Sequence, residues 1–289
     1  MRRGVRLFFN AWMRFLEDDG WAIASHIALS GLTSLFPFLI FIAALSGFVG
    51  SQSLADEAAR LVFDAWPDEV AGPMATEMSR VLTEARGGVL TLGAILALYF
   101  SSSAVEAVRT ALNRAYQARD ERPWYVLRLE SLAYVVFGAF TLLVFATLIV
   151  FAPLVWTTVL EVAPAIEPLS RTFTFGRLGI TSLILIAWLG IAHRFLAAGP
   201  RTIREVSPGV CLTFVLWIVT GEGFGLYLQQ FASNYVTTYA GLASVMITVV
   251  FLYTLAAIFI YGGELNAEII RRRTEKLQAR LAAQRAMMG

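Results

Sequence analysis

One carboxylate lies inside an apolar segment, where an ionisable side chain is costly. Glu222 occurs in the stretch Gly-Glu-Gly-Phe-Gly (221–225), within a run long enough to cross a membrane. Ionisable residues at such depths commonly bind protons, ions or polar substrate groups, and flanking glycines permit close helix approach. Glu222 is therefore the first candidate transport residue. The alternative is a protonated structural acid, bonded to a neighbouring helix or reached by water.

A second polar group precedes Pro37 in the first apolar run. Its members recur at near-helical spacing and would suit the lining of a transport path: His26, Ser30, Thr33 and Ser34. Hydrogen bonds between helices beside a proline kink would produce the same pattern, and we favour that interpretation. His193, at the inner end of the fourth apolar run, is expected to lie at the membrane interface.

Charged and amide side chains also gather where apolar runs meet the basic loops. The candidate inner-rim site consists of Asp19, Arg109, Asn113, Glu264 and Asn266. Ion pairing that fastens helix ends is the simpler interpretation of the charges in this region. The alternative is a polar site of the size of a lipid headgroup at the cytoplasmic leaflet.

The sequence offers little for enzyme chemistry. Two histidines and the single Cys211 cannot supply a common His/Cys metal cluster, and we find neither a G-x-S-x-G motif nor a P-loop. We therefore predict no enzyme activity, no cofactor and no catalytic or metal-binding residue. Nucleic acid is not expected as a partner, because membrane topology accounts for the basic loops.

The candidate residues need elements to position them, and the composition indicates membrane helices. Hydrophobic residues make up 57% of the chain and charged residues 15%, against about 25% charged in an average soluble domain. About 20 helical residues cross a hydrocarbon core, and six apolar runs are long enough: 21–49, 88–107, 129–155, 178–198, 208–230 and 240–263. The second run is the weakest of them because it ends in three serines.

The distribution of basic residues predicts the orientation. Of the 23 Lys and Arg residues, 18 fall at the termini and in the second and fourth connecting segments, and 5 fall in the other segments. Because Lys and Arg concentrate in cytoplasmic loops, both termini are predicted to be cytoplasmic, which requires an even number of spans. The predicted fold is an all-α polytopic membrane protein: one domain, 1–289, with six transmembrane helices.

Three segments are not expected to span. Residues 1–20 place Trp12, Phe15 and other apolar residues on one helical face, which is typical of a helix lying in the membrane interface. The acidic loop 50–87 predicts two short outer amphipathic helices. The stretch 265–289 predicts a second amphipathic segment at the cytoplasmic surface with a basic tail.

Several stretches resemble one bacterial family. They are ALSGLTSLFP at 28–37, ALNRAY at 111–116, SPG at 207–209, and YAGLA at 239–243 leading to GGELNAE at 262–268. In these the chain resembles the YihY/BrkB family of bacterial inner-membrane proteins, sometimes labelled ribonuclease BN-like. The resemblance implies a six-span fold in the inner membrane and a link to envelope integrity, with lipid translocation for some members.

Two functions from different classes follow. The first is a transporter or lipid-translocating protein that is not driven by ATP, with membrane lipids as partners. The second is a scaffold subunit of an envelope complex, whose partner protein would contact 50–87; a homo-oligomer is compatible with either. A cavity that reaches Glu222 or the His26 stripe would favour the first, and a closely packed interior the second.

Overall fold

The computed structural model describes residues 3–49, 87–239 and 243–288, and within these ranges every regular element is a helix. The all-α prediction is confirmed. The outer helices predicted for 50–87 lie outside the described residues, apart from Gly87. The elements are α1 (Arg3–Glu17), α2 (Gly20–Val49), α5 (Gly87–Ala115), α6 (Trp124–Ala146), η1 (Thr147–Phe151), α7 (Ala152–Val162), η2 (Pro164–Leu169), α8 (Ser170–Ile191), η3 (Ala192–Leu196), α9 (Ile203–Tyr239) and α10 (Ala243–Met288).

Five helical stretches in the described residues are long and apolar enough to cross a membrane: Ile95–Ala115, Trp124–Val162, Pro164–Leu196, Ile203–Leu228 and Val245–Met287. The 30-residue helix α2 coincides with the remaining predicted run. The weak second run is helical, and two of its serine hydroxyls are satisfied by bonds back to their own helix: Ser101 Oγ donates to the Ala97 carbonyl at 2.7 Å, and Ser102 Oγ donates to the Tyr99 carbonyl at 2.6 Å. A polytopic helical membrane protein is thus confirmed, and the exact number of crossings stays a prediction.

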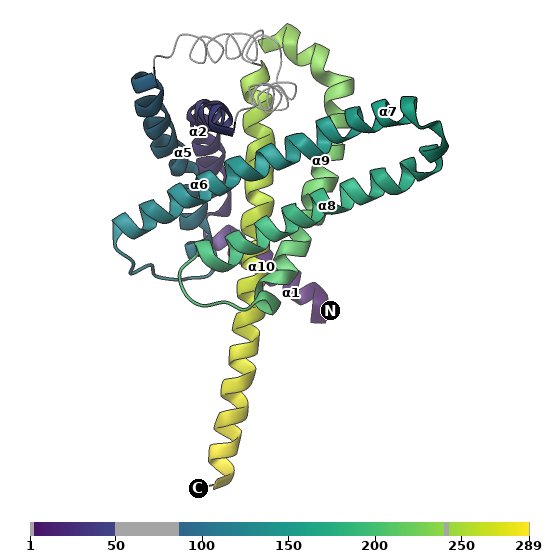
Figure 1. Ribbon diagram of the computed structural model, residues 1–289. Coiled ribbons are helices and arrows are strands. Elements are labelled where there is room, and N and C mark those ends of the chain that lie inside the picture. Colours follow the sequence, from purple (N-terminus) through teal and green to yellow (C-terminus); the bar gives the residue numbers. More distant parts are fainter. Residues whose placement is uncertain (1–2, 50–86, 240–242, 289) are drawn as a thin grey trace.

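Both ends of the described chain lie towards the same end of the molecule (Figure 1). Helix α1, the loops 116–123 and 197–202 and the C-terminal half of α10 are found there, whereas the turn between α7 and α8 lies at the opposite end. We call the end that contains α1, these two loops and the C-terminal half of α10 the arginine-rich end. An even number of crossings predicts this arrangement, and the cytoplasmic orientation of the arginine-rich end stays a prediction.

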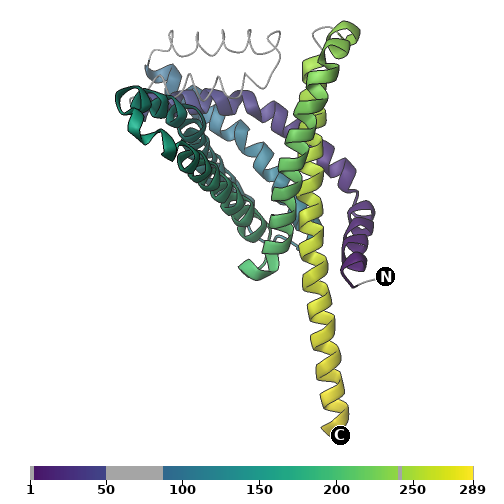
Figure 2. The ribbon, with the colours of Figure 1, turned by 90° about the vertical axis from the view of Figure 1, so that its right-hand side faces the viewer.

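Helix α10 is one continuous element of 46 residues. Figures 1 and 2 show its C-terminal part projecting away from the other helices, and residues 273–287 are exposed. The segment after Glu264 thus continues α10 as part of the same helix, and its expected position at the membrane surface stays a prediction. Residues 264–288 contain neither Gly nor Pro, so nothing interrupts the helix after the last apolar run.

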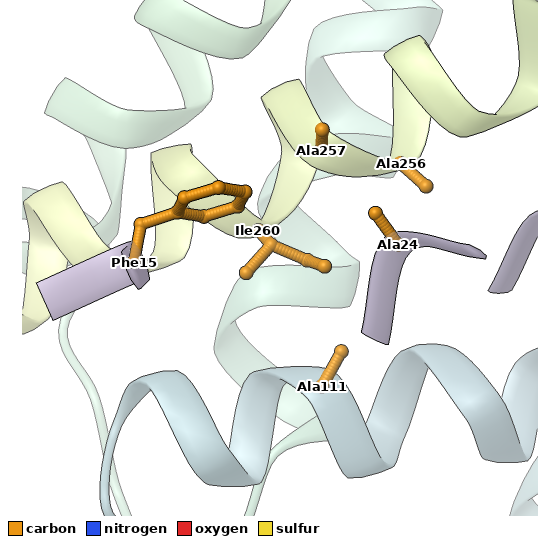
Figure 3. Packing of buried hydrophobic residues seen from close by; sticks show 6 residues of the cluster. All are labelled: Phe15, Ala24, Ala111, Ala256, Ala257 and Ile260. Carbon is orange, nitrogen blue, oxygen red and sulfur yellow. The ribbon is translucent and has the colours of Figure 1, made fainter. Parts of the chain in front are cut away.

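Small side chains bring four helices together around Ile260. Figure 3 shows the cluster, which joins α1, α2, α5 and α10: Phe15, Ala24, Ala111, Ala256, Ala257 and Ile260. Phe15 is fully buried in this cluster, so the expectation that it faces lipid is wrong. The turn from α1 to α2 needs Gly20, because a Cβ atom there would overlap the Phe15 ring.

The hairpin of α6, α7 and α8 crosses α9 and α10 obliquely (Figure 1). The stretch Trp124–Val162 contains 39 residues, whose helical length of about 58 Å exceeds a hydrocarbon core of about 30 Å and requires tilt. Two π-helical turns interrupt the hairpin, η1 after α6 and η3 after α8. The turn η3 lies at the arginine-rich end, and π-turns are frequent at functional sites.

Candidate functional site

A chain of buried and part-buried hydrogen bonds joins α9, α10, the 116–123 loop and η3 at the arginine-rich end. Pro208 has no N–H group and interrupts the hydrogen-bond ladder near the start of α9, and the next residue, Gly209, donates its N–H to Asn266 Oδ1 at 2.7 Å. This bond fixes the amide orientation, so Asn266 Nδ2 donates to Tyr116 Oη at 3.2 Å. Tyr116 Oη lies 3.3 Å from His193 Nδ1. Burial raises the pKa of Tyr116 to about 12, which keeps this hydroxyl protonated.

The same crossing requires glycine on both helices. A Cβ atom at Gly209 would overlap the Gly262 carbonyl oxygen and lie 2.6 Å from Asn266 Nδ2. A Cβ atom at Gly262 would overlap Thr213 Oγ1. Helices α9 and α10 therefore touch through their backbones at this point. The stretches 207–209 and 262–268 noted in the sequence meet here, together with the end of 111–116.

His193 is completely buried, in contrast to the interfacial position expected from the sequence. Its ring lies 4.5 Å from the Phe259 ring, between centroids. Two neighbouring features explain the burial: η3 turns the side chain inward, and α10 passes beside it at Gly263. His193 and Tyr116 thus belong to the hydrogen-bond chain that begins at Gly209, and sequence reasoning assigned neither of them to a site.

Two of the three predicted inner-rim charges, Arg109 and Asp19, form ion pairs. Arg109 is buried and donates to Glu130 Oε2 at 3.3 Å and to Ser131 Oγ at 2.8 Å. Asp19 pairs with Arg114 at 2.8 Å, and both of these side chains are largely exposed. These contacts support the interpretation that charges fasten helix ends. Loss of Glu130 should cost more than loss of the exposed Asp19–Arg114 pair, because it would leave the buried Arg109 without its carboxylate partner.

Asn113 ties two loops of the arginine-rich end together. Its Oδ1 accepts the N–H of Ala198 at 2.7 Å, and its Nδ2 donates to Asp120 Oδ2 at 3.3 Å. Arg122 donates to both oxygens of Asp120 at 2.8 and 2.7 Å. These hydrogen bonds hold the pKa of Asp120 at about 2, despite the opposing effect of partial burial. The 116–123 and 197–202 loops are therefore fixed to each other.

A basic depression of about 610 Å³ lies between these two loops. We call it the basic bowl, and its charged lining residues are Arg119, Asp120, Glu121, Arg122, Arg194 and Arg201. Arg122 also donates to Glu130 at 2.8 Å and to the Leu196 carbonyl at 3.2 Å. Arg201 donates to the carbonyl groups of residues 197–199, and its guanidinium carbon lies 3.9 Å from the centroid of the Tyr116 ring. These two arginines are part of the wall.

Glu264 borders a separate, smaller cavity of about 340 Å³ on the other side of the 199–201 turn. Its side chain is buried, and Arg14 and Arg271 line the same cavity. Of the predicted inner-rim residues, Asn113 and Asn266 are therefore structural connectors, Arg109 and Asp19 are ion-paired, and Glu264 faces this cavity.

An open apolar cleft of about 320 Å³ lies between α2, α5, α6 and α8. Four polar side chains contribute to its wall, and each donates its hydrogen bond within the protein. Ser34 Oγ donates to the Phe100 carbonyl and Ser101 Oγ to the Ala97 carbonyl. Tyr134 Oη donates to the Ile191 carbonyl and Trp188 Nε1 to Thr141 Oγ1. The wall thus presents hydrocarbon and aromatic surface, which suits an apolar ligand.

The turn η3 separates the cleft from the basic bowl. Ala192 and Leu196 line the cleft, whereas Arg194 and Phe195 line the bowl. The wider π-turn thus turns successive residues towards two different cavities. One short element therefore adjoins both an apolar and a basic surface.

The structure does not bring the predicted transport residues together. Within the polar stripe, Ser34 is buried and lines the apolar cleft. Thr33 bonds back to the carbonyls of its own helix, and His26 is exposed. Ser30 is half-buried, and of the four residues only Ser34 lines the cleft. One member of the stripe, Ser34, nonetheless lies beside a cavity, the apolar cleft.

Glu222 is exposed on α9 and lines none of the three cavities described above. A Cβ atom at any of its three neighbouring glycines would meet nothing within 4 Å. In the described residues these glycines therefore mediate no close helix approach. The expectation of a Glu222 packed against a neighbouring helix does not hold within this part of the chain.

These features define a polytopic helical membrane protein with an apolar cleft beside a basic cavity at its arginine-rich end. The chain belongs to the BrkB family: the model of the family described as virulence factor BrkB matches residues 11–286. The resemblance noted in the sequence is thereby confirmed.

The relatives of this chain include membrane proteins and a ribonuclease-like protein. The putative ribonuclease-like protein YfkH of Bacillus subtilis is 26% identical over 90% of this chain and 94% of its own length. A UPF0761 membrane protein of Rhodospirillum centenum is 28% identical over 97% of this chain and 62% of its own length. One from Xanthomonas campestris is 23% identical over 89% and 59%. The chain thus spans about three fifths of these UPF0761 relatives, and no solved structure matches it.

Proposed function

We propose that this protein is an envelope membrane protein of the bacterial inner membrane that binds lipid in the apolar cleft and moves it between leaflets. Its termini would face the cytoplasm, as the distribution of basic residues predicts. The observation that supports the proposal is the cleft itself. It lies among helices long enough to cross the membrane, and its polar side chains have hydrogen-bond partners in the protein.

The cleft suits an acyl chain better than a polar solute. A polar substrate would lose its hydrogen bonds to water on entering, and Ser34, Ser101, Tyr134 and Trp188 offer no free donor in exchange. An acyl chain makes no hydrogen bonds with its surroundings, so it loses none on entering the cleft. We find no nucleotide-binding motif in the sequence, so a gradient or a partner would supply any energy needed for directed movement.

The test is transbilayer lipid movement in vesicles with a plugged cleft. Ala104 lines the cleft on α5, and an indole in its place would fill the space meant for the chain. The wild-type protein and the Ala104→Trp variant would be reconstituted into vesicles containing a lipid with a fluorescent headgroup. A membrane-impermeant quencher then reports how fast the inner-leaflet lipid reaches the outer leaflet. We expect acceleration by the wild type and the rate of protein-free vesicles for the variant.

The matched control is Ala133→Trp, because Ala133 is an exposed residue of α6 that does not line the cleft. It should behave as the wild type. Equal rates for Ala104→Trp and Ala133→Trp would contradict the proposal. If the wild-type protein keeps lipid bound in the cleft during purification but does not accelerate lipid movement, the proposed translocation is refuted and the proposed lipid binding is not. A wild type without either activity would favour a scaffold function, with an envelope protein bound through 50–87.

A further inference from the structure

We propose that the basic bowl is a binding site for a negatively charged phosphate group. The bowl is not part of the apolar cleft, and its arginines were explained in the sequence by topology alone. Four arginines and two acidic residues line it, so the lining carries a positive net charge. The bowl should therefore attract anions.

Two of the four arginines have donors that the protein does not use. In the described part of the chain, no hydrogen bond or ion pair involves the side chain of Arg119 or Arg194. The Arg194 guanidinium carbon lies 4.9 Å from the Phe195 ring centroid, a contact that leaves its N–H groups free. Arg122 and Arg201, in contrast, are held by carboxylates and carbonyl groups and fix the wall. The bowl thus combines a rigid wall with two available guanidinium groups.

The acidic residues of the lining do not cancel this charge. Asp120 is ionised, and its charge is paired with Arg122 by two hydrogen bonds. Glu121 is exposed at the rim and opposes the two free arginines with a single charge. Guanidinium groups bind phosphate oxygens through paired N–H donors. A phosphate group offers several oxygens at once, so it is the ligand that best suits a cavity lined by two arginines with unused N–H donors.

The phosphate can come from a lipid headgroup or from a soluble phosphate ester. The lipid source rests on the proposed function, because η3 places the bowl directly beside the cleft. The Leu196 side chain lines the cleft, while its carbonyl is held by Arg122 of the bowl. A lipid whose chain occupied the cleft would therefore carry its headgroup near the bowl. Binding of a soluble phosphate ester needs no cleft.

The test is ligand binding to the purified full-length protein in a neutral detergent. The probes are phosphatidylglycerol, phosphatidylcholine and oleate in mixed micelles, and glycerol phosphate and inorganic phosphate in solution. The bowl variant is Arg119→Gln/Arg194→Gln. Its matched control is Arg280→Gln/Arg285→Gln, which removes the same charge from the exposed part of α10. Equal melting temperatures of the two variants would verify that both are folded.

We expect the wild type to prefer phosphatidylglycerol to phosphatidylcholine. The bowl variant should bind phosphatidylglycerol about 30-fold more weakly, which corresponds to about 1 kcal/mol for each arginine, and the control should bind as the wild type does. Dependence on the two arginines for phosphatidylglycerol alone would identify a lipid source. The same dependence for glycerol phosphate or inorganic phosphate would identify a soluble source.

Three results would overturn the inference: equal affinities in the bowl variant and the control, the absence of binding by every phosphate probe, or oleate binding with the same dependence on the two arginines. Failure of the proposed lipid function is a separate outcome. In that case Ala104→Trp would leave lipid binding unchanged, while soluble phosphate would still require Arg119 and Arg194.

Discussion

Helix α9 carries glycines in two regions whose surroundings are opposite. At Gly209 the helix touches α10 so closely that a Cβ atom would overlap a carbonyl oxygen. At Gly221, Gly223 and Gly225 an added Cβ atom would meet no atom within 4 Å among the described residues. Glycine therefore marks a helix contact in the first region and none in the second. A glycine-rich stretch beside an acidic residue is not by itself evidence of a buried site.

Two carboxylates, Glu130 on α6 and Glu222 on α9, show a similar contrast. Glu130, at the arginine-rich end, receives hydrogen bonds from Arg109 and Arg122. Glu222 is exposed on α9. The comparison predicts that one conservative substitution, Glu to Gln, has very different effects at the two positions.

The largest effect is expected for Glu130→Gln. Removal of this charge leaves Arg109 buried without its carboxylate partner, and breaking a buried pair in this way costs about 3–5 kcal/mol. The melting temperature in detergent should fall strongly, as measured by intrinsic fluorescence. Arg114→Gln, which breaks the exposed pair with Asp19, is the control and should cost about 0–1 kcal/mol. Similar losses for the two variants would show that burial does not distinguish these pairs.

A medium effect is expected for Gly209→Ala. The added methyl group forces α9 away from α10 and disturbs the bond from Gly209 to Asn266, and overpacking of this kind costs about 1–3 kcal/mol. Gly223→Ala adds the same methyl group to the same helix in open space. It should leave the melting temperature unchanged or raise it slightly, because alanine favours helix. A loss of stability at Gly223 as large as that at Gly209 would contradict the comparison.

The sequence could predict how deep a residue lies in the membrane. It could not predict which residues of other helices that residue contacts. Hydropathy located the helices because each apolar run must match the thickness of the bilayer. It also placed Asn113 and Asn266 near one end, since both follow apolar runs. It could not show that Asn266 bonds Gly209 and Tyr116, because that depends on how the helices are rotated against each other. The one feature of Asn113 and Asn266 in the sequence that indicated such bonds was the amide group, which can both donate and accept.

The basic bowl was missed for a different reason. Arg119, Arg122, Arg194 and Arg201 were fully explained by the positive-inside rule, so no further function was assigned to them. Their convergence depends on η3 and on the Asn113 bridge between two loops. Neither feature leaves a periodic pattern in the sequence. The straight continuation of α10, by contrast, had a visible signal in the absence of Gly and Pro from residues 264–288.

The smallest effect is expected for Glu222→Gln. No hydrogen bond or ion pair of Glu222 is found in the described part of the chain, and its side chain does not line the cleft. Gln keeps the size of the side chain and removes only the charge, so the melting temperature should not change. Lipid movement in the vesicle assay should also equal that of the wild type, because the cleft is intact. A loss of lipid movement at unchanged stability would instead support Glu222 as a transport residue, as its position within an apolar run first indicated.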